Sequence, residues 1–137
     1  NIEFTIDYED QLGNPQTQVT TTNTTSQDTE VIFDSVLPTL TSVSISSNNT
    51  NTQVAEVGDI VSIYFTSDEP IQNVLVDMAN NSADIVINTS GNNWRADYTI
   101  QSGDSAGVIQ FLIDFEDGHG NSGIQVNSIT TGTDVTI

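Results

Sequence analysis

Hydrophobic and polar residues alternate along most of this chain with a period of two. The first example is the segment 2–8, whose apolar residues are Ile2, Phe4, Ile6 and Tyr8. This alternation predicts a strand with one buried face. A turn is expected at 10–15, where Gly13 suits a positive φ. A polar strand is predicted at Gln18–Thr25, with a continuation at Val31–Phe33.

Seven further strands are predicted, separated by turns rich in Gly, Asn, Ser or Asp. They are Leu40–Ser46, Ile60–Thr66, Val74–Met78, Ala83–Asn88, Trp94–Ile100, Val108–Phe115 and Gln125–Ile137. Short strands with turns every 8–12 residues or so, in a unit of about 100 residues, are typical of an immunoglobulin-like antiparallel β-sandwich. No segment has apolar residues at helical spacing over a useful length. We therefore predict an all-β fold.

The inward-facing positions of these strands predict the core. It should contain Val43, Ile45, Val61, Ile63, Phe65, Val74, Val76, Ile85, Ile87, Trp94, Tyr98, Ile100, Ile109, Phe111 and Ile113. Trp94 leads an alternating strand, which favours a core position over a platform for a ligand.

The beginning of the chain resembles its end. Residues 2–19 match residues 109–126 at a constant offset (111 − 4 = 107), so that Phe4 corresponds to Phe111 and Asn14 to Asn121. A second match, of 29–33 with 133–137, has an offset of 104 (135 − 31). A repeat of this length is the size of a domain rather than of a solenoid unit.

The repeat predicts the organisation of the chain. Residues 1–33 would be the last strand pair of a preceding or shared immunoglobulin-like unit, 34–38 a linker, and 39–137 one complete domain. Pro38 in the linker disfavours a regular ladder. The first residue is Asn1 rather than Met, from which we expect a processed product or an excised piece of a tandem array.

The composition is strongly acidic, with 19 Asp and Glu residues against the single cation Arg95 and a net charge of −18. Nucleic acid and anionic membrane surfaces would be repelled, so neither is expected as a partner. No stretch of 18 apolar residues predicts insertion into a membrane. The charge has two interpretations: a solubilising surface, or carboxylates that gather in space and bind cations. We favour some gathering, because the repulsion is otherwise uncompensated.

Four motifs, in this order and spacing, identify a resemblance. They are LPTLTSVSI at Leu37–Ile45, VGDIV at Val57–Val61, FTSDE at Phe65–Glu69 and DGHGN at Asp117–Asn121. This order resembles the bacterial Ig-like domains of large repetitive surface proteins and adhesins. The resemblance covers 34–137, and 2–33 match the final third of the same unit. It implies an extracellular stalk or adhesive module on the cell surface, often stiffened by calcium at the domain junctions.

Strand direction predicts a cation site independently. Each strand of the sandwich reverses direction, so the turn after the second strand and the turn after the sixth should return to the end where the linker arrives. The residues expected there are Asp34, Asp68, Glu69, Asp117 and Asn121, with Asp114 as a further candidate. Such hard oxygen ligands, of which about six to eight are needed in total, suit Ca²⁺ rather than Mg²⁺ or Zn²⁺. The alternative is that Asp117 and Asn121 only hydrogen-bond their own turn.

Catalysis is not expected. His119, the only histidine, has no Cys or second His to form a zinc site, and it is predicted to be an exposed turn residue. Acidic pairs are used by glycosidases, but a small sandwich offers no deep cleft. A carbohydrate-binding module would need exposed coplanar aromatic residues, which are few.

Two functions therefore remain open. One is a structural or adhesive repeat module of an extracellular protein, whose partners are neighbouring Ig-like domains. The other is a subunit of an extracellular filament, assembled from identical chains by strand donation or β-augmentation. Because the chain holds two copies of the last strand pair and one copy of the first five strands, simple exchange would leave one pair unused.

Overall fold

The computed structural model describes residues 3–20 and 33–137, and every regular element in them is a β-strand. Its contacts divide the chain into two units, Asn1–Ser35 and Val36–Ile137. The predicted strands at Gln18–Thr25 and Val31–Phe33, and the second match at 29–33, fall largely outside the described residues. None of the described residues forms a helix long and apolar enough to cross a membrane.

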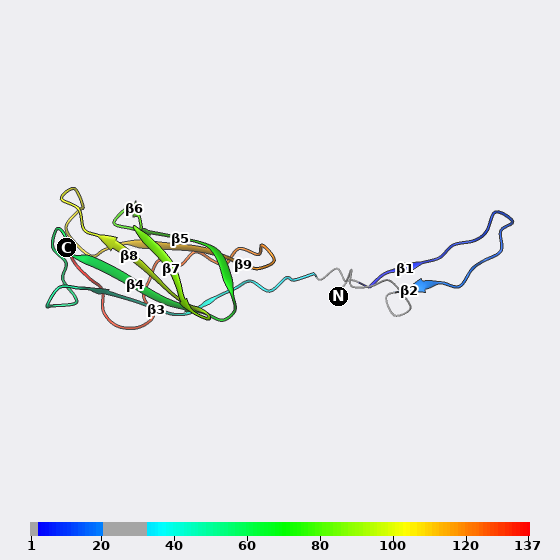
Figure 1. Ribbon diagram of the computed structural model, residues 1–137, viewed down its shortest axis with the longest axis horizontal. Coiled ribbons are helices and arrows are strands. Elements are labelled where there is room, and N and C mark those ends of the chain that lie inside the picture. The colour runs from blue at the N-terminus through cyan, green and yellow to red at the C-terminus, as the bar shows by residue number, and fades with distance from the viewer. Residues whose placement is uncertain (1–2, 21–32) are drawn as a thin grey trace. The chain divides into compact units, whose positions relative to one another are not determined.

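Two antiparallel sheets make up the C-terminal unit (Figure 1). The first has four strands in the order β3-β4-β8-β7, which are Leu40–Ser47, Ile60–Ser67, Asn93–Thr99 and Ile85–Ser90. The second has three in the order β6-β5-β9, which are Asn81–Ser82, Ile71–Met78 and Phe111–Asp117. Apart from the short β6, this division of the strands is that of an immunoglobulin-like sandwich. The predicted all-β antiparallel sandwich is confirmed.

The seventh predicted strand, Gln125–Ile137, is not a regular strand. Its Val126 pairs with Ile113 of β9, but the N–H groups of Thr130 and Thr131 both bond to the carbonyl of Val43 in β3. The segment thus leaves one sheet for the other within a few residues. A continuous ladder cannot form along a strand that changes sheets.

The core lies between the two sheets and agrees with the prediction at most positions. Val43, Ile63 and Ile113, for example, have no exposed surface. The prediction is wrong for Ile85 and Ile87, which are 45% and 40% exposed. On β7 it is Val86 that packs against the core, opposite the buried Ala96 of β8.

The N-terminal unit contains a hairpin. Its strands β1 (Thr5–Ile6) and β2 (Val19–Thr20) are antiparallel, and a further bridge joins Glu9 to Pro15. The apolar residues of its alternating face are about half exposed: Phe4, Ile6 and Tyr8 are 42%, 52% and 50% exposed. The hairpin therefore has the predicted face of alternating apolar residues, and that face is uncovered.

Candidate functional site

The turn that follows β9 is built around Asp117. Its Oδ1 accepts hydrogen bonds from the backbone N–H groups of His119 (2.8 Å) and Asn121 (2.9 Å), and its Oδ2 accepts one from the Asn121 side chain (2.7 Å). Gly120, at φ +88°, supplies the left-handed residue that closes the turn. The Asp117 carboxylate has no exposed surface, whereas His119 is exposed as predicted.

These hydrogen bonds set the protonation of Asp117. Desolvation acts to raise the pKa of its carboxyl group. The bonds from the side chain and backbone of Asn121 and from the backbone of His119 act in the opposite direction and prevail, so the pKa lies below its ordinary value of 3.8. Asp117 is thus an anion that its own turn solvates. This is the arrangement expected for a turn held by Asx hydrogen bonds.

Asp68 is used in a similar way. Its Oδ1 accepts the backbone N–H of Thr39 at 2.8 Å, and its Oδ2 accepts the Thr39 hydroxyl at 2.7 Å. The Asp68 N–H bonds back to the Thr39 carbonyl at 3.0 Å. The backbone and hydroxyl bonds from Thr39 lower the pKa of Asp68. Asp68 thereby ties the β4–β5 turn to the residue that follows the buried Pro38.

Two of the remaining predicted ligands, Asp114 and Glu69, have hydrogen-bonding partners of their own in the sandwich. Asp114 lies on the exposed face of β9, where both of its oxygens accept from the Gln125 side chain, at 2.9 and 3.0 Å. Glu69 is half-buried, and its backbone carbonyl accepts the Ser67 hydroxyl. Asp34 belongs to the N-terminal unit, so a site that combines it with Asp117 stays a prediction.

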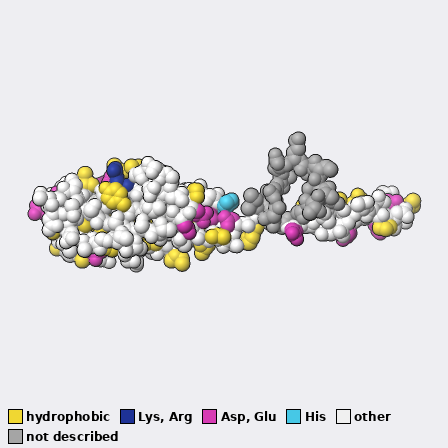
Figure 2. Space-filling model, turned by 90° about the horizontal axis from the view of Figure 1, so that it is seen from below, with side chains coloured by type: hydrophobic (Ala, Val, Ile, Leu, Met, Phe, Trp, Pro, Cys, Tyr) yellow, Lys and Arg dark blue, Asp and Glu magenta, His cyan; other side chains and the backbone are white. Residues whose placement is uncertain are grey.

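Two of the carboxylates predicted to bind calcium, Asp68 and Asp117, are already hydrogen-bonded within the sandwich. Figure 2 shows acidic side chains beside the single histidine at one end of this unit. Within residues 36–137, however, no three carboxylate or imidazole groups come close enough to share one ion. Calcium takes about six to eight oxygen ligands. The carboxylate oxygens of Asp68 already accept hydrogen bonds from Thr39, and those of Asp117 accept hydrogen bonds from their own turn. Both residues thus belong to hydrogen-bonded structures, and binding of an ion by them stays a prediction.

The same turn occurs a second time, in the N-terminal hairpin. Asp10 Oδ1 accepts the N–H groups of Leu12 (2.9 Å) and Asn14 (3.0 Å), and its Oδ2 accepts the Asn14 side chain (2.9 Å). Gly13, at φ +83°, takes the place of Gly120. The side-chain bond from Asn14, followed by the backbone bonds, lowers the pKa of Asp10. Every partner is thus displaced by 107 residues from its counterpart around Asp117.

The strands of the two hairpins also correspond. Ile6 pairs with Val19 as Ile113 pairs with Val126, and the bridge Glu9–Pro15 corresponds to Glu116–Ser122. A side-chain clamp is repeated as well: Gln18 donates to Asp7 at 2.7 Å, as Gln125 donates to Asp114. Sequence reasoning missed this pair of hydrogen-bonded side chains. The sequence did contain a signal for it, since both residues recur at the offset of 107.

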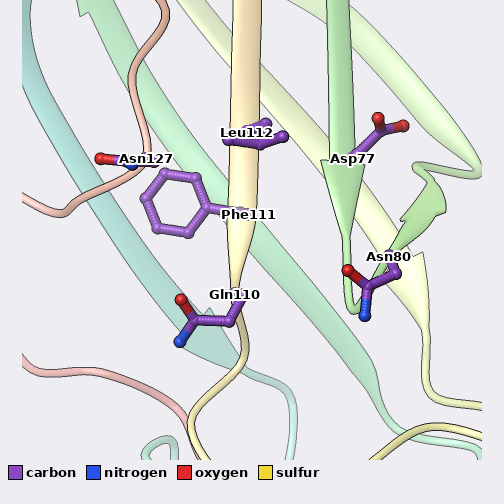
Figure 3. Close-up of a pocket in the computed structure, with 6 residues that line it drawn as sticks. All are labelled: Asp77, Asn80, Gln110, Phe111, Leu112 and Asn127. Atoms are coloured by element: carbon purple, nitrogen blue, oxygen red, sulfur yellow. The ribbon is translucent and has the colours of Figure 1, made fainter.

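A pocket of about 360 Å³ lies over the β5–β9 sheet (Figure 3). Its lining residues are Asp77, Asn80, Gln110, Phe111, Leu112 and Asn127. Sequence reasoning gave no indication of it, because its residues come from three separate segments. The Phe111 side chain is buried, and so it offers no exposed ring for stacking against a sugar.

The outer face of the four-stranded sheet carries the only cation. Arg95 forms an ion pair with Asp97 at 3.0 Å, and Tyr64 and Ile87 flank it on the neighbouring strands. Trp94, on the opposite face of β8, stacks on Phe65 with the ring centroids 6.3 Å apart, and packs against the core as predicted. Among the aromatic residues of the sandwich, Tyr64 alone is exposed, at 46%.

Comparison with known proteins adds no relative. No protein-family model, curated protein or solved structure matches the chain. The internal repeat is therefore the relationship on which functional reasoning can draw.

Proposed function

We propose that this chain is a structural repeat module of an extracellular surface or matrix protein, in which immunoglobulin-like units follow one another along the polypeptide. The observation that carries this proposal is the repeated hairpin, in which strand register, Asp–Asn turn and Gln–Asp clamp all recur at an offset of 107 residues. Repetition at the scale of a domain is the pattern of a modular array.

The surface of the sandwich supports a structural role over a catalytic one. The carboxylates predicted to bind a cation stabilise turns: Asp68 ties Thr39 to the β4–β5 turn, and Asp117 closes its own turn. A carbohydrate-binding role would need several exposed rings, but in the sandwich Tyr64 stands alone in this respect. The net charge of −18 keeps neighbouring modules soluble and mutually repelled.

The second candidate is a filament subunit that assembles from identical chains. The uncovered face of the N-terminal hairpin favours it, because strand addition is a common way to join subunits. Its weakness lies in the stoichiometry. In the sandwich, β5 already pairs with the chain's own β9, so an intact copy presents no vacant place for a donated hairpin.

The natural polypeptide separates the two candidates. For the repeat module, intact mass and peptide mapping should give a chain much longer than 137 residues, with further units at intervals of about one domain. Antibodies against the sandwich should also label intact cells or matrix. A mature polypeptide of 137 residues would refute the array and support the filament. Labelling that requires permeabilised cells would refute the extracellular role.

Calcium at the junction remains a separate proposal. It rests on strand direction, on the charge of the chain and on the resemblance, and it needs Asp34 from the N-terminal unit together with Asp117. Thermal unfolding in Ca²⁺ and then in excess chelator tests it. An ion that binds only the folded state stabilises it by about 2.7 kcal/mol at a hundredfold excess over its dissociation constant. Equal midpoints in the two conditions would reject calcium and leave the repeat module standing.

A further inference from the structure

The two hairpins of this chain have one structure and opposite environments. Phe111, Ile113 and Phe115 in the sandwich are 6%, 0% and 4% exposed. Their counterparts in the N-terminal hairpin, Phe4, Ile6 and Tyr8, are about half exposed. The sandwich therefore shows what covers this face when it is covered.

In the sandwich, β9 is covered in two ways: one edge pairs with a neighbouring strand, and its apolar face packs in the core. The edge of β9 that is turned away from its hairpin partner is hydrogen-bonded to β5, with Val76 opposite Ile113 and Met78 opposite Phe111. The inward side chains of β9 join one buried cluster with those of β3, β4 and β8. In the described N-terminal hairpin, β1 pairs with β2 alone. Its other edge and its apolar face are both available.

Polar groups on β5 provide an independent match. The Gln72 side chain donates to the Asp117 carbonyl at 2.9 Å, and the Asn73 side chain donates to the Glu116 carboxylate. Asn73 lies at φ +50° in an irregularity of β5 that directs its amide there. The hairpin keeps the acidic side chain as Glu9, and the backbone carbonyl of Asp10 corresponds to that of Asp117. A strand like β5 would therefore find the same acceptors on the hairpin.

We propose that residues 3–20 complete a second sandwich, by docking on a unit that has the structure of residues 36–108 and lacks its own last hairpin. The hairpin inserts as the strand next to a β5-like strand, with Ile6 opposite the position of Val76 and Phe4 opposite that of Met78. The partner is a preceding unit of the same polypeptide, because an intact copy of the sandwich has this place filled by β9. This proposal rests on the repeated organisation of the proposed function and is independent of its extracellular location.

The test extends the intact chain. Residues 36–108 are joined directly before residue 2, so that the hairpin follows its acceptor at the spacing of the sandwich. Hydrogen exchange is then measured at the amides of 4–8 in the extended and the unextended chain. Completion of a stable sandwich should slow this exchange by roughly 1,000-fold or more. A chain in which residues 109–126 replace 2–19 provides the reference for a completed unit.

Two substitutions test which face of the hairpin docks, and a measurement on the unextended chain controls for folding of the sandwich. Ile6→Asp should abolish the protection in the extended chain, whereas Thr5→Asp, on the adjacent outward position, should leave it in place. In the unextended chain, Ile6→Asp should leave the unfolding midpoint of the 36–137 sandwich unchanged. Exchange that is equally fast in both chains, while the reference chain is protected, would overturn the proposal. Self-association of the unextended chain with protected hairpin amides would also overturn it, in favour of a second copy as the partner. Neither result would bear on where the protein is located.

Discussion

Truncation of two equivalent isoleucines provides the most direct test of the structure. Ile113 and Ile6 occupy the same position of the repeated hairpin, yet the first has no exposed surface and the second is 52% exposed. Replacement by alanine removes the equivalent of three methylene groups, worth about 2.4 kcal/mol at roughly 0.8 kcal/mol for each buried group. A residual cavity adds to this cost, and such truncations in cores span about 2–5 kcal/mol.

The expected shift follows from the size of the sandwich. For a domain of about 100 residues, 1 kcal/mol corresponds to roughly 4–8 °C in the unfolding midpoint. Ile113→Ala should therefore lower the midpoint by about 10–20 °C. Ile6→Ala should change the midpoint of the sandwich by no more than about 2 °C, since exposed substitutions cost little.

Tryptophan fluorescence is the appropriate assay. Trp94 is the only tryptophan of the chain and stacks on Phe65 inside the sandwich, so its emission reports on that unit alone. Circular dichroism provides a second probe. If Ile113→Ala does not fold, the milder pair Ile113→Val and Ile6→Val allows the same comparison. The buried substitution, Ile113→Val, should then lower the free energy of unfolding by about 0.5–1.5 kcal/mol. Equal losses for the two members of either pair would refute the claim that the hairpin face is uncovered.

Three further outcomes are expected. Gly123→Ala should destabilise the sandwich by about 1–3 kcal/mol through overpacking, because a Cβ there would clash with the Phe115 ring. In chemical denaturation, Gly118→Ala, whose Cβ would meet nothing within 4 Å, should cost much less. The lowered pKa values of Asp68 and Asp117 give stability that is complete above their ordinary value of 3.8 and is lost as the pH falls below it. The midpoint should thus drop between pH 6 and pH 3 or so, less steeply in Asp117→Asn, and a rise on acidification would mean that relief of carboxylate repulsion dominates. If Asp34 and Asp117 share Ca²⁺, removal of the ion with a chelator should lower the unfolding midpoint of a chain that contains both units. An unchanged unfolding midpoint would show that hydrogen bonds alone hold the Asp117 turn.

Much of the fold could be predicted because most strands have one polar and one apolar face. β4 alternates strictly from Val61 to Phe65, and its buried residues are those predicted. The edge strand β7 contains the run Ile85-Val86-Ile87, which is apolar on both faces, so alternation could not decide which face is inside. The register with β8 decides it, since Val86 lies opposite the buried Ala96. Register between strands is a tertiary property that the local pattern does not contain.

The candidate site shows the same division between local and tertiary information. Sequence reasoning identified Asp117 and Asn121 as a pair, and the two are joined by hydrogen bonds. It could not establish whether their oxygens remain available to an ion, because this depends on how the turn orients its N–H groups. Thr39 was missed as the partner of Asp68 because it lies 29 residues away along the chain.

In the N-terminal hairpin, the effect of local hydrogen bonds can be distinguished from the effect of burial, whereas the two act together in a sandwich. Its Asp–Asn turn, its clamp and its strand register are those of the buried copy, although the apolar face is bare. These features are specified by contacts within about 15 residues, which cost little entropy to close. Local contacts thus specify the register of the hairpin, and burial would add the stability that an isolated two-stranded hairpin lacks. If the hairpin completes a neighbouring sandwich as proposed, the locally specified register would lower the ordering cost of docking. The same property suits a module that is repeated along a chain, because each junction then requires only the docking of one preformed hairpin on the strands before it.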